Sequence, residues 1–185
     1  MPAFYLTLIT VLLAGFGARD QMTIVGLSAR QGQRPGVLLV ALLSAVSTAA
    51  FAVWLAGLML GQLPPPARAI FAAIALGLAG LESLIVVPRR RPAEPTNSLG
   101  ALLLVLLASQ ITDAARFLIF GMGVGMAAPL AAGAAGAAGA AILVSAAWAL
   151  PRFLEGAAAR WTRRGVGLVL VVAALVLFLR EISIL

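Results

Sequence analysis

The sequence predicts an all-α integral membrane protein, with six transmembrane helices arranged as two inverted three-helix repeats. Three observations lead to this prediction. The 185-residue chain has a mean hydropathy of +1.10 and only 10% charged residues, whereas soluble domains carry about 25%. Its apolar runs reach the roughly 20 residues that a helix needs to cross a bilayer. Two similar segments, each with charges inside an apolar run, recur at a constant offset of 95 residues.

Six apolar runs follow one another along the chain, and each is interpreted as one membrane helix. Pro64-Pro65-Pro66 divides the second from the third, and Pro88 ends the third. Ser98 or Asn97 is in position to cap the fourth, because these side chains accept hydrogen bonds from the first backbone N–H groups of a helix. The predicted helices cover residues 3–29, 36–62, 67–87, 99–126, 130–154 and 164–184.

The fifth predicted helix carries a glycine stripe, with Gly133, Gly136 and Gly139 at every third position. Such spacing gives a smooth strip on which neighbouring helices can approach closely. The same spacing could also arise by chance in a chain this rich in alanine and glycine. Both interpretations predict a tightly packed helix with no chemical role.

All thirteen basic residues are arginine, and the formal charge is +7. In a soluble protein this excess of positive charge would suggest a nucleic-acid partner. Here the distribution of the arginines among the loops explains the excess, so no such partner is expected. If the N-terminus lies outside, one side of the membrane holds nine arginines and the other two, which identifies the first side as cytoplasmic. Both termini are then expected outside the cytoplasm. The nine are Arg30, Arg34, Arg89, Arg90, Arg91, Arg152, Arg160, Arg163 and Arg164, and the two are Arg68 and Arg180.

The repeated segments divide the chain into two units. Residues 14–27 align with residues 109–122, so that Ile24 is paired with Ile119. Because each unit contains three helices, the second copy is expected to be inverted in the membrane. The predicted units are a first repeat over 1–88, a cytoplasmic linker over 89–98 and a second repeat over 99–185.

Both repeated segments place charges at mid-membrane depth. Arg19 and Asp20 lie just past the centre of the first helix, whereas Gln110, Asp113 and Arg116 share one face at the centre of the fourth. One charge at the bilayer centre costs about 2.5–3.5 kcal/mol, so four unpaired charges would cost about 10–14 kcal/mol. We therefore expect the two helices to be adjacent at the bundle centre, with the charges paired or lining a wet cavity.

Two pairing schemes and two roles are open for these four charges. The symmetric scheme pairs Asp20 with Arg116 and Arg19 with Asp113, and the local scheme pairs Asp113 with Arg116 at i, i+3. The quartet is either a transport site, as in secondary transporters built from duplicated units, or a neutral ion-pair lock. Transport is favoured, because intramembrane ionisable residues are functional by default. Glu82, near the end of the third helix, is expected to be structural and partly hydrated.

The segment from Ala14 to Arg30, with Gly17, Arg19 and Gln21, resembles the first motif helix of a known family. This family comprises small transporters that exchange manganese or calcium for protons, including Golgi cation exchangers and bacterial manganese exporters, within the lysine-exporter superfamily. The resemblance spans nearly the whole chain. It implies six or seven helices in two inverted units, each with a Glu-x-Gly-Asp-(Lys/Arg)-(Ser/Thr) motif whose acids form the cation site. It also implies a bacterial inner-membrane location.

The first motif copy matches only in part. Gly15 stands where the resemblance implies the glutamate, and Ala18 where it implies the aspartate. Gly17 and Arg19 keep the glycine and the basic position. Asp20 replaces the serine or threonine, and so offers a substitute carboxylate close to the lost one.

In the second copy Gln110 replaces the glutamate and Thr112 the glycine, whereas Asp113 keeps its acid. Hard divalent cations prefer several oxygen ligands with net negative charge around them. Arg19 and Arg116 oppose a cation unless the site rearranges. The predicted substrate or ion site is Asp113, Gln110, Asp20 and Thr112, with Asp113, Gln110 and Asp20 as the metal ligands.

The expected function is secondary membrane transport, resembling divalent cation–proton antiport with a substrate altered by the loss of motif acids. The alternatives are a non-transporting membrane protein held by the charged quartet, and a transporter whose arginines bind a small anion or zwitterion. An enzyme is not expected, since no nucleophile–base pair, metal cluster or nucleotide loop is present, and no cofactor is expected either. The chain has no cysteine or histidine, which excludes disulfides and thiolate or imidazole metal sites. The expected partners are the lipid bilayer and the transported ion.

Overall fold

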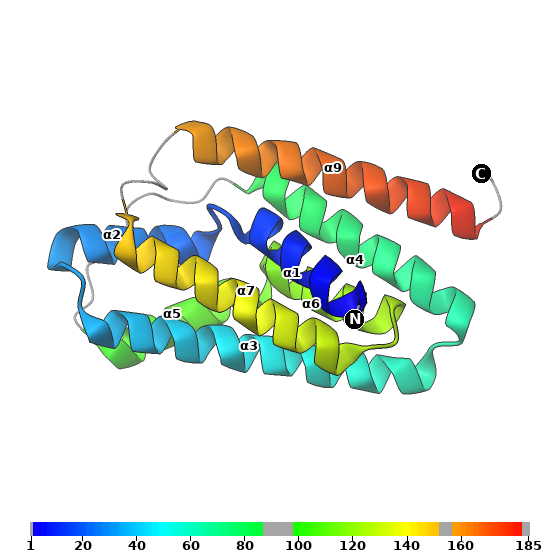
Figure 1. The fold of residues 1–185 in the computed structure, drawn as a ribbon, viewed down its shortest axis with the longest axis horizontal. Helices are drawn as coiled ribbons and strands as arrows, with labels where there is room; N and C mark the ends of the chain where they lie inside the picture. Colours follow the sequence, from blue (N-terminus) through cyan, green and yellow to red (C-terminus); the bar gives the residue numbers. More distant parts are fainter. Residues whose placement is uncertain (1, 87–97, 152–156, 183–185) are drawn as a thin grey trace.

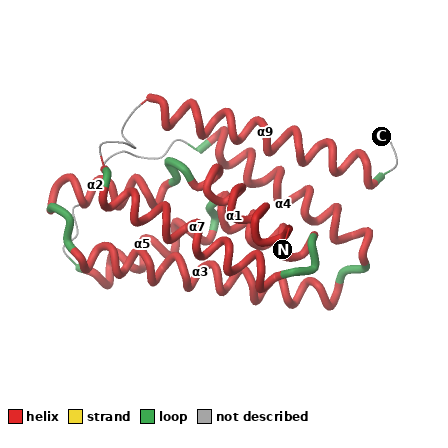
Figure 2. Tube along the Cα trace, viewed as in Figure 1, coloured by secondary structure: helices red, strands yellow, loops and turns green. Residues whose placement is uncertain are grey.

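The computed structural model describes residues 2–86, 98–151 and 157–182. These residues form eight helices and no strand (Figures 1 and 2). Most of the predicted linker lies outside the described residues, as do Arg89 to Arg91, Asn97 and Arg152. The helices are α1 (Pro2–Gly15), α2 (Arg19–Gln31), α3 (Pro35–Gln62), α4 (Pro65–Ile85), α5 (Leu99–Ile111), α6 (Ala114–Gly125), α7 (Pro129–Ala149) and α9 (Ala157–Glu181).

Four helices, α3, α4, α7 and α9, contain stretches long and apolar enough to cross a membrane. The pairs α1–α2 and α5–α6 also qualify if each is one bent span, which gives up to six spans. The predicted all-α class is confirmed for the described residues, and the four to six candidate spans are compatible with an integral membrane protein. Pro35, Pro65 and Pro129 each stand at the start of a helix, where a missing backbone N–H costs nothing. The side chain of Ser98 caps α5 by accepting a hydrogen bond from the Ala101 N–H at 3.3 Å.

The first and fourth predicted helices are not continuous, and this corrects the prediction. The chain bends by 57° between α1 and α2 and by 54° between α5 and α6. At the first break Gly17 has φ +70°, a left-handed conformation that glycine adopts without a steric penalty. At the second break Asp113 is extended, with φ −92° and ψ 148°. The polar residues of both repeated segments therefore lie at or beside helix ends.

Small residues allow the helices to pack closely. A Cβ added to Gly121 of α6 would overlap Ala75 of α4, and one added to Gly136 of α7 would overlap Ile119 of α6. Gly133 faces α3 and Gly139 faces α1 in the same way, so the glycine stripe packs tightly, as predicted. A separate close contact joins α4 and α9, where Gly80 lies against Gly167. Figure 1 shows α9 lying along α4 at one side of the bundle.

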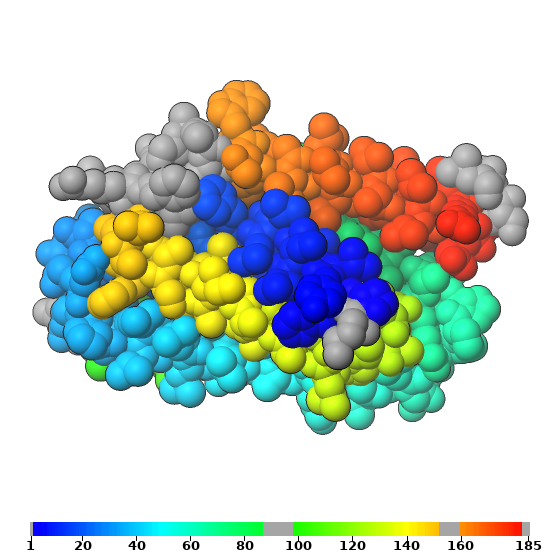
Figure 3. Space-filling model, viewed as in Figure 1, coloured from blue at the N-terminus to red at the C-terminus, as the bar shows by residue number. Residues whose placement is uncertain are grey.

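The outer surface is apolar over much of its area, as a lipid-facing surface requires. Large apolar side chains on α3, α5, α7 and α9 are exposed, and Figure 3 shows α1, α7 and α9 packed side by side on one face. Apart from Arg19, Arg116 and Arg163, which form ion pairs between helices, the described arginines stand near the ends of helices. One end of the bundle, called here the arginine-rich end, is where α2 ends and α3 and α9 begin; the other carries Arg68 and Arg180 (Figure 1).

Candidate functional site

The two helix breaks lie next to each other in the core. Helix α1 packs on α6, and α2 packs on α5, as expected for the two charged helices. Asp20 is in the first turn of α2, and Asp113 is the residue immediately before α6. The N-terminus of a helix carries a partial positive charge and unpaired N–H groups, so both carboxylates lie where a negative charge is stabilised. One Asp20 oxygen, Oδ1, accepts a hydrogen bond from the Gln21 N–H at 2.8 Å.

Asp20 and Asp113 share one arginine. The Nη1 atom of Arg116 lies 4.0 Å from Asp20 Oδ2 and 3.7 Å from Asp113 Oδ2. All three side chains are buried. Both the symmetric Asp20–Arg116 pair and the local Asp113–Arg116 pair are thus present at once.

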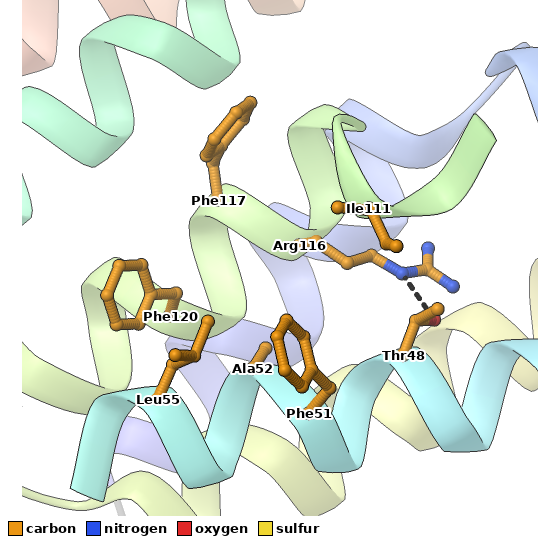
Figure 4. Close-up of a pocket in the computed structure, with 8 residues that line it drawn as sticks. All are labelled: Thr48, Phe51, Ala52, Leu55, Ile111, Arg116, Phe117 and Phe120. Atoms are coloured by element: carbon orange, nitrogen blue, oxygen red, sulfur yellow. Dashed lines mark hydrogen bonds between the residues drawn. The ribbon is translucent and has the colours of Figure 1, made fainter. Parts of the chain in front are cut away.

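Uncharged polar groups join this arrangement across the bundle. Gln110 Nε2 donates to Asp20 Oδ2 at 3.0 Å. Arg116 Nε donates to Thr48 Oγ1 at 3.0 Å, the hydrogen bond drawn in Figure 4. The Thr48 hydroxyl lies 3.1 Å from Gln110 Oε1 and 2.9 Å from the Ser44 carbonyl, which compete for its single proton. The five residues that form what we call the central cluster are Asp20, Thr48, Gln110, Asp113 and Arg116.

A second group of charges, called here the side cluster, consists of Arg19, Glu82 and Arg163. Arg163 Nη2 donates to Glu82 Oε2 at 2.6 Å, and Arg19 Nε lies 3.6 Å from Glu82 Oε1. Arg19 Nη2 also donates to the Thr112 carbonyl at 2.8 Å and to its hydroxyl at 2.9 Å. Because Thr112 follows the last residue of α5, this cation neutralises the negative end of that half-helix.

The side cluster corrects two predictions. The predicted Arg19–Asp113 pair is not among the ion pairs of the described residues, since Arg19 contacts Glu82 and Thr112 instead. Glu82 is not partly hydrated, because its side chain is only 8% exposed between two arginines. The cause is that α9 begins at Ala157 and not at 164, so that Arg163 lies inside a helix that packs on α4.

The predicted site residues are brought together in part. Asp20, Gln110, Asp113 and Arg116 meet in the central cluster, whereas Thr112 lies beside it with its side chain bound to Arg19. Thr48 is a member that the sequence analysis missed. The only feature of the sequence that could have indicated Thr48 is its hydroxyl group in the middle of the apolar helix α3.

The described residues contain no group of three or more histidine, cysteine, aspartate or glutamate side chains that could hold a metal ion. The predicted ligands Asp20 and Asp113 are occupied by Arg116, and Gln110 points its amide nitrogen at Asp20. Counted with every acidic and basic side chain ionised, the central cluster has two carboxylates for one arginine, and the side cluster has two arginines for one carboxylate. The two clusters therefore carry formal charges of opposite sign, −1 and +1, in the same bundle.

An apolar cavity of about 160 Å³ adjoins the central cluster (Figure 4). It lies between α3 and the α5–α6 break, and its polar members are Thr48 and Arg116. Its mouth is on the outer surface, where Phe51 and Ile111 are exposed. The remaining lining residues are Ala52, Leu55, Phe117 and Phe120.

Comparison with known proteins gives no match to a family model, to a curated protein or to a solved structure.

Proposed function

We propose that the chain is a secondary transporter that moves a small cation in exchange for protons, with the central cluster as its substrate site. The observation that carries this proposal is that two carboxylates, one at each helix break, share one arginine inside an apolar bundle. Broken helices whose ends meet at mid-membrane depth are a common way to build a transporter site. One carboxylate in excess gives the cluster the capacity for one more positive charge.

The proposal includes six spans in two inverted three-helix repeats. In its support, α2 begins at Arg19 and α6 at Ala114, 95 residues later, and the two bends differ by only 3°. Each bent pair is followed by two long helices, α3 and α4 or α7 and α9. With three spans in each repeat, the second repeat has the opposite orientation.

The proposed orientation places the arginine-rich end in the cytoplasm and both termini outside. It is supported by the positive-inside rule and by four arginines at the helix ends that define the arginine-rich end: Arg30 in the last turn of α2, Arg34 immediately before α3, and Arg160 and Arg164 near the start of α9. A bacterial inner membrane is the proposed location, on the strength of the family resemblance.

Manganese and calcium are the first cations to test. Both prefer oxygen ligands in a negatively charged site, so Arg116 has to withdraw from Asp20 and Asp113 before either ion binds. Arginine does not lose its proton in proteins, and only movement can remove its charge from the site. The proposed transport step is therefore an exchange of the Arg116 side chain for the cation.

Two observations favour the alternative functions. The buried pairs formed by Arg116 and Arg163 connect α2 with α6 and α4 with α9, as an ion-pair lock would. The cavity of about 160 Å³ beside Arg116 would suit the apolar part of a small organic anion, with the guanidinium binding its charged group.

A flux assay with the purified full chain in liposomes separates these functions. Manganese, calcium and small anions are offered with and without a proton gradient, to the wild type, Asp113→Asn, and Glu181→Gln as an exposed control. Cation flux that needs the gradient and is lost only in Asp113→Asn supports the proposal. Anion flux supports the second candidate. No flux at all, together with a stable triple variant Asp20→Asn/Asp113→Asn/Arg116→Gln in which the whole group is neutral, supports the lock.

A further inference from the structure

The apolar cavity beside the central cluster lies halfway along α3. This helix has 28 residues, and at about 1.5 Å of rise per residue its Thr48 and Phe51 lie within about 4 Å of its midpoint. Both residues line the cavity. With α3 as one of the proposed spans, the cavity is near the centre of a hydrocarbon core about 30 Å thick. The acyl chains of the two lipid leaflets end at this depth.

The cavity opens towards the surface that lipid would cover. Phe51 and Ile111 at its mouth are 45% and 53% exposed. Figure 4 shows Phe51, Ala52 and Leu55 on the side of α3 that is turned towards α6. A molecule that enters through this mouth comes from the interior of the bilayer and not from water.

The walls of the cavity suit a hydrocarbon chain. All of its lining residues except Thr48 and Arg116 are apolar. The Thr48 hydroxyl is already engaged, because it accepts from Arg116 Nε at 3.0 Å and lies 2.9 Å from the Ser44 carbonyl. The volume is about 160 Å³, and a cavity of about 150 Å³ with aliphatic and aromatic walls stays dry and binds benzene. An apolar occupant therefore fits this cavity better than water does.

An anionic group is the competing occupant, because Nη2 of Arg116 has no hydrogen-bond partner among the described residues. Two observations oppose it. Arg116 is already shared by the carboxylates of Asp20 and Asp113, which would repel a third negative charge. The mouth also opens at the depth where a charged group is most costly. The apolar end of a chain meets neither obstacle.

We propose that the cavity binds the end of a phospholipid acyl chain, which covers the lipid-facing side of Arg116 and Thr48 and keeps water away from it. The chain end packs against Leu55 of α3 and against Phe117 and Phe120 of α6. This site rests on the membrane location in the proposed function, and it does not require transport. A cation that reaches the central cluster has to arrive by another route.

Photochemical labelling of the full chain tests the site. The protein is reconstituted in phosphatidylcholine vesicles in which some lipid carries a photoreactive diazirine at the end of one acyl chain, and labelled residues are identified by mass spectrometry. Phe117 and Phe120 are only partly exposed, whereas Val46, as far from the midpoint of α3 as Phe51, is 50% exposed. A chain end held in the cavity is expected to label the two phenylalanines more strongly than Val46. Equal or stronger labelling of Val46 overturns the proposal, and so does the absence of label from all three.

Two variants that fill the cavity are compared with a matched control. Ala52→Phe is expected to remove the label from Phe117 and Phe120. Ala50→Phe, the same change at an exposed position of α3, is expected to leave the label in place. Leu55→Trp is a second variant in case Ala52→Phe disturbs folding, since Leu55 is a partly exposed residue of the wall. Label that persists in both cavity variants overturns the proposal.

Competition with octanol and octanoate separates a neutral chain from an anion. Both compounds are expected to displace the label, because the apolar walls bind the chain that they share. Displacement by octanoate alone overturns the proposal in favour of an anionic occupant. If labelling is as expected but liposomes show no cation flux, the lipid site stands and the proposed transport fails. Flux without label in the cavity overturns the lipid site alone.

Discussion

At the scale of single residues, the central cluster depends most on Arg116. It is the one cation that the described ion pairs place beside Asp20 and Asp113, at 4.0 and 3.7 Å. Its removal would leave two buried carboxylates without compensation, whereas removal of Asp113 would leave Arg116 paired with Asp20. Loss of the Arg116 charge should therefore destabilise the protein more than loss of the Asp113 charge.

We expect Arg116→Gln to lower the free energy of unfolding by about 3–5 kcal/mol, the usual cost of leaving a buried charge unpaired. Asp113→Asn should cost less, because asparagine keeps the shape and Asp20 still neutralises the arginine. Denaturant unfolding of both variants in detergent measures the difference. An equal loss in the two variants would contradict the shared-arginine geometry.

Glu82 holds the side cluster together in the same way. Its side chain is 8% exposed and neutralises Arg163, which is 4% exposed. Glu82→Gln should therefore destabilise the protein by about 3–5 kcal/mol. Glu181→Gln, at the exposed end of α9, should stay within about 0.5 kcal/mol of the wild type. If thermal unfolding shows no difference between the two variants, Glu82 is not the buried counter-ion described above.

At the scale of helices, close contacts between small residues decide which elements stay together. Gly121 of α6 lies against Ala75 of α4, and Gly125 lies against Ala72 one turn further along. These contacts hold α4 against the half-helix that carries Arg116. The packing of α4 on α6 thus fixes the position of the shared arginine.

Gly121→Ala and Gly57→Ala are a matched pair that tests this contact. At Gly121 the new Cβ would overlap Ala75, so the helices have to separate, at a cost of about 1–3 kcal/mol. At Gly57 of α3 nothing lies within 4 Å, and alanine should stabilise the helix by about 0.5–1 kcal/mol. Melting temperatures that shift in opposite directions are expected. A shared direction would argue against the α4–α6 contact.

The helix breaks also define what the sequence could and could not predict. The apolar pattern and the offset of 95 residues predicted the helical class and placed Asp20, Asp113 and Arg116 together. Neither break contains a proline, and hydropathy continues across both, so each bent pair was predicted as one straight helix. The one local signal was Gly17 beside polar residues, and its left-handed φ of +70° is visible only in the structure.

The side cluster shows the other limit of prediction from sequence. Glu82, Arg163 and Arg19 lie on three helices, and only packing brings the two arginines within 4 Å of Glu82. Hydropathy alone puts Arg163 in a loop, because the apolar run begins after it, and helix boundaries are the least certain part of a prediction from sequence. Thr48 was missed for a similar reason, since a threonine in an apolar helix has no distinctive pattern around it.

At the scale of the whole molecule, the uneven distribution of arginine predicts which end faces the cytoplasm. The chain has no cysteine, so a single introduced cysteine is the only thiol that a labelling reagent can modify. A cysteine at Thr96, in the linker, should react with an impermeant thiol reagent only from the cytoplasmic side. A cysteine at Gln62, at the exposed end of α3, should react only from outside. Labelling of both positions from one side would contradict the inverted repeats.

The exclusive use of arginine has a consequence for how the bundle responds to an electric field. Because guanidinium groups keep their proton, the positive charges of Arg19, Arg116 and Arg163 are permanent. The proposed binding of a cation at the central cluster would therefore add its charge to arginines that keep theirs. Moving one charge through the full membrane potential is worth about 2.3 kcal/mol per 100 mV. A cation that reaches the central cluster from one side, as proposed above, crosses part of that potential, so its occupancy of the cluster should depend on voltage.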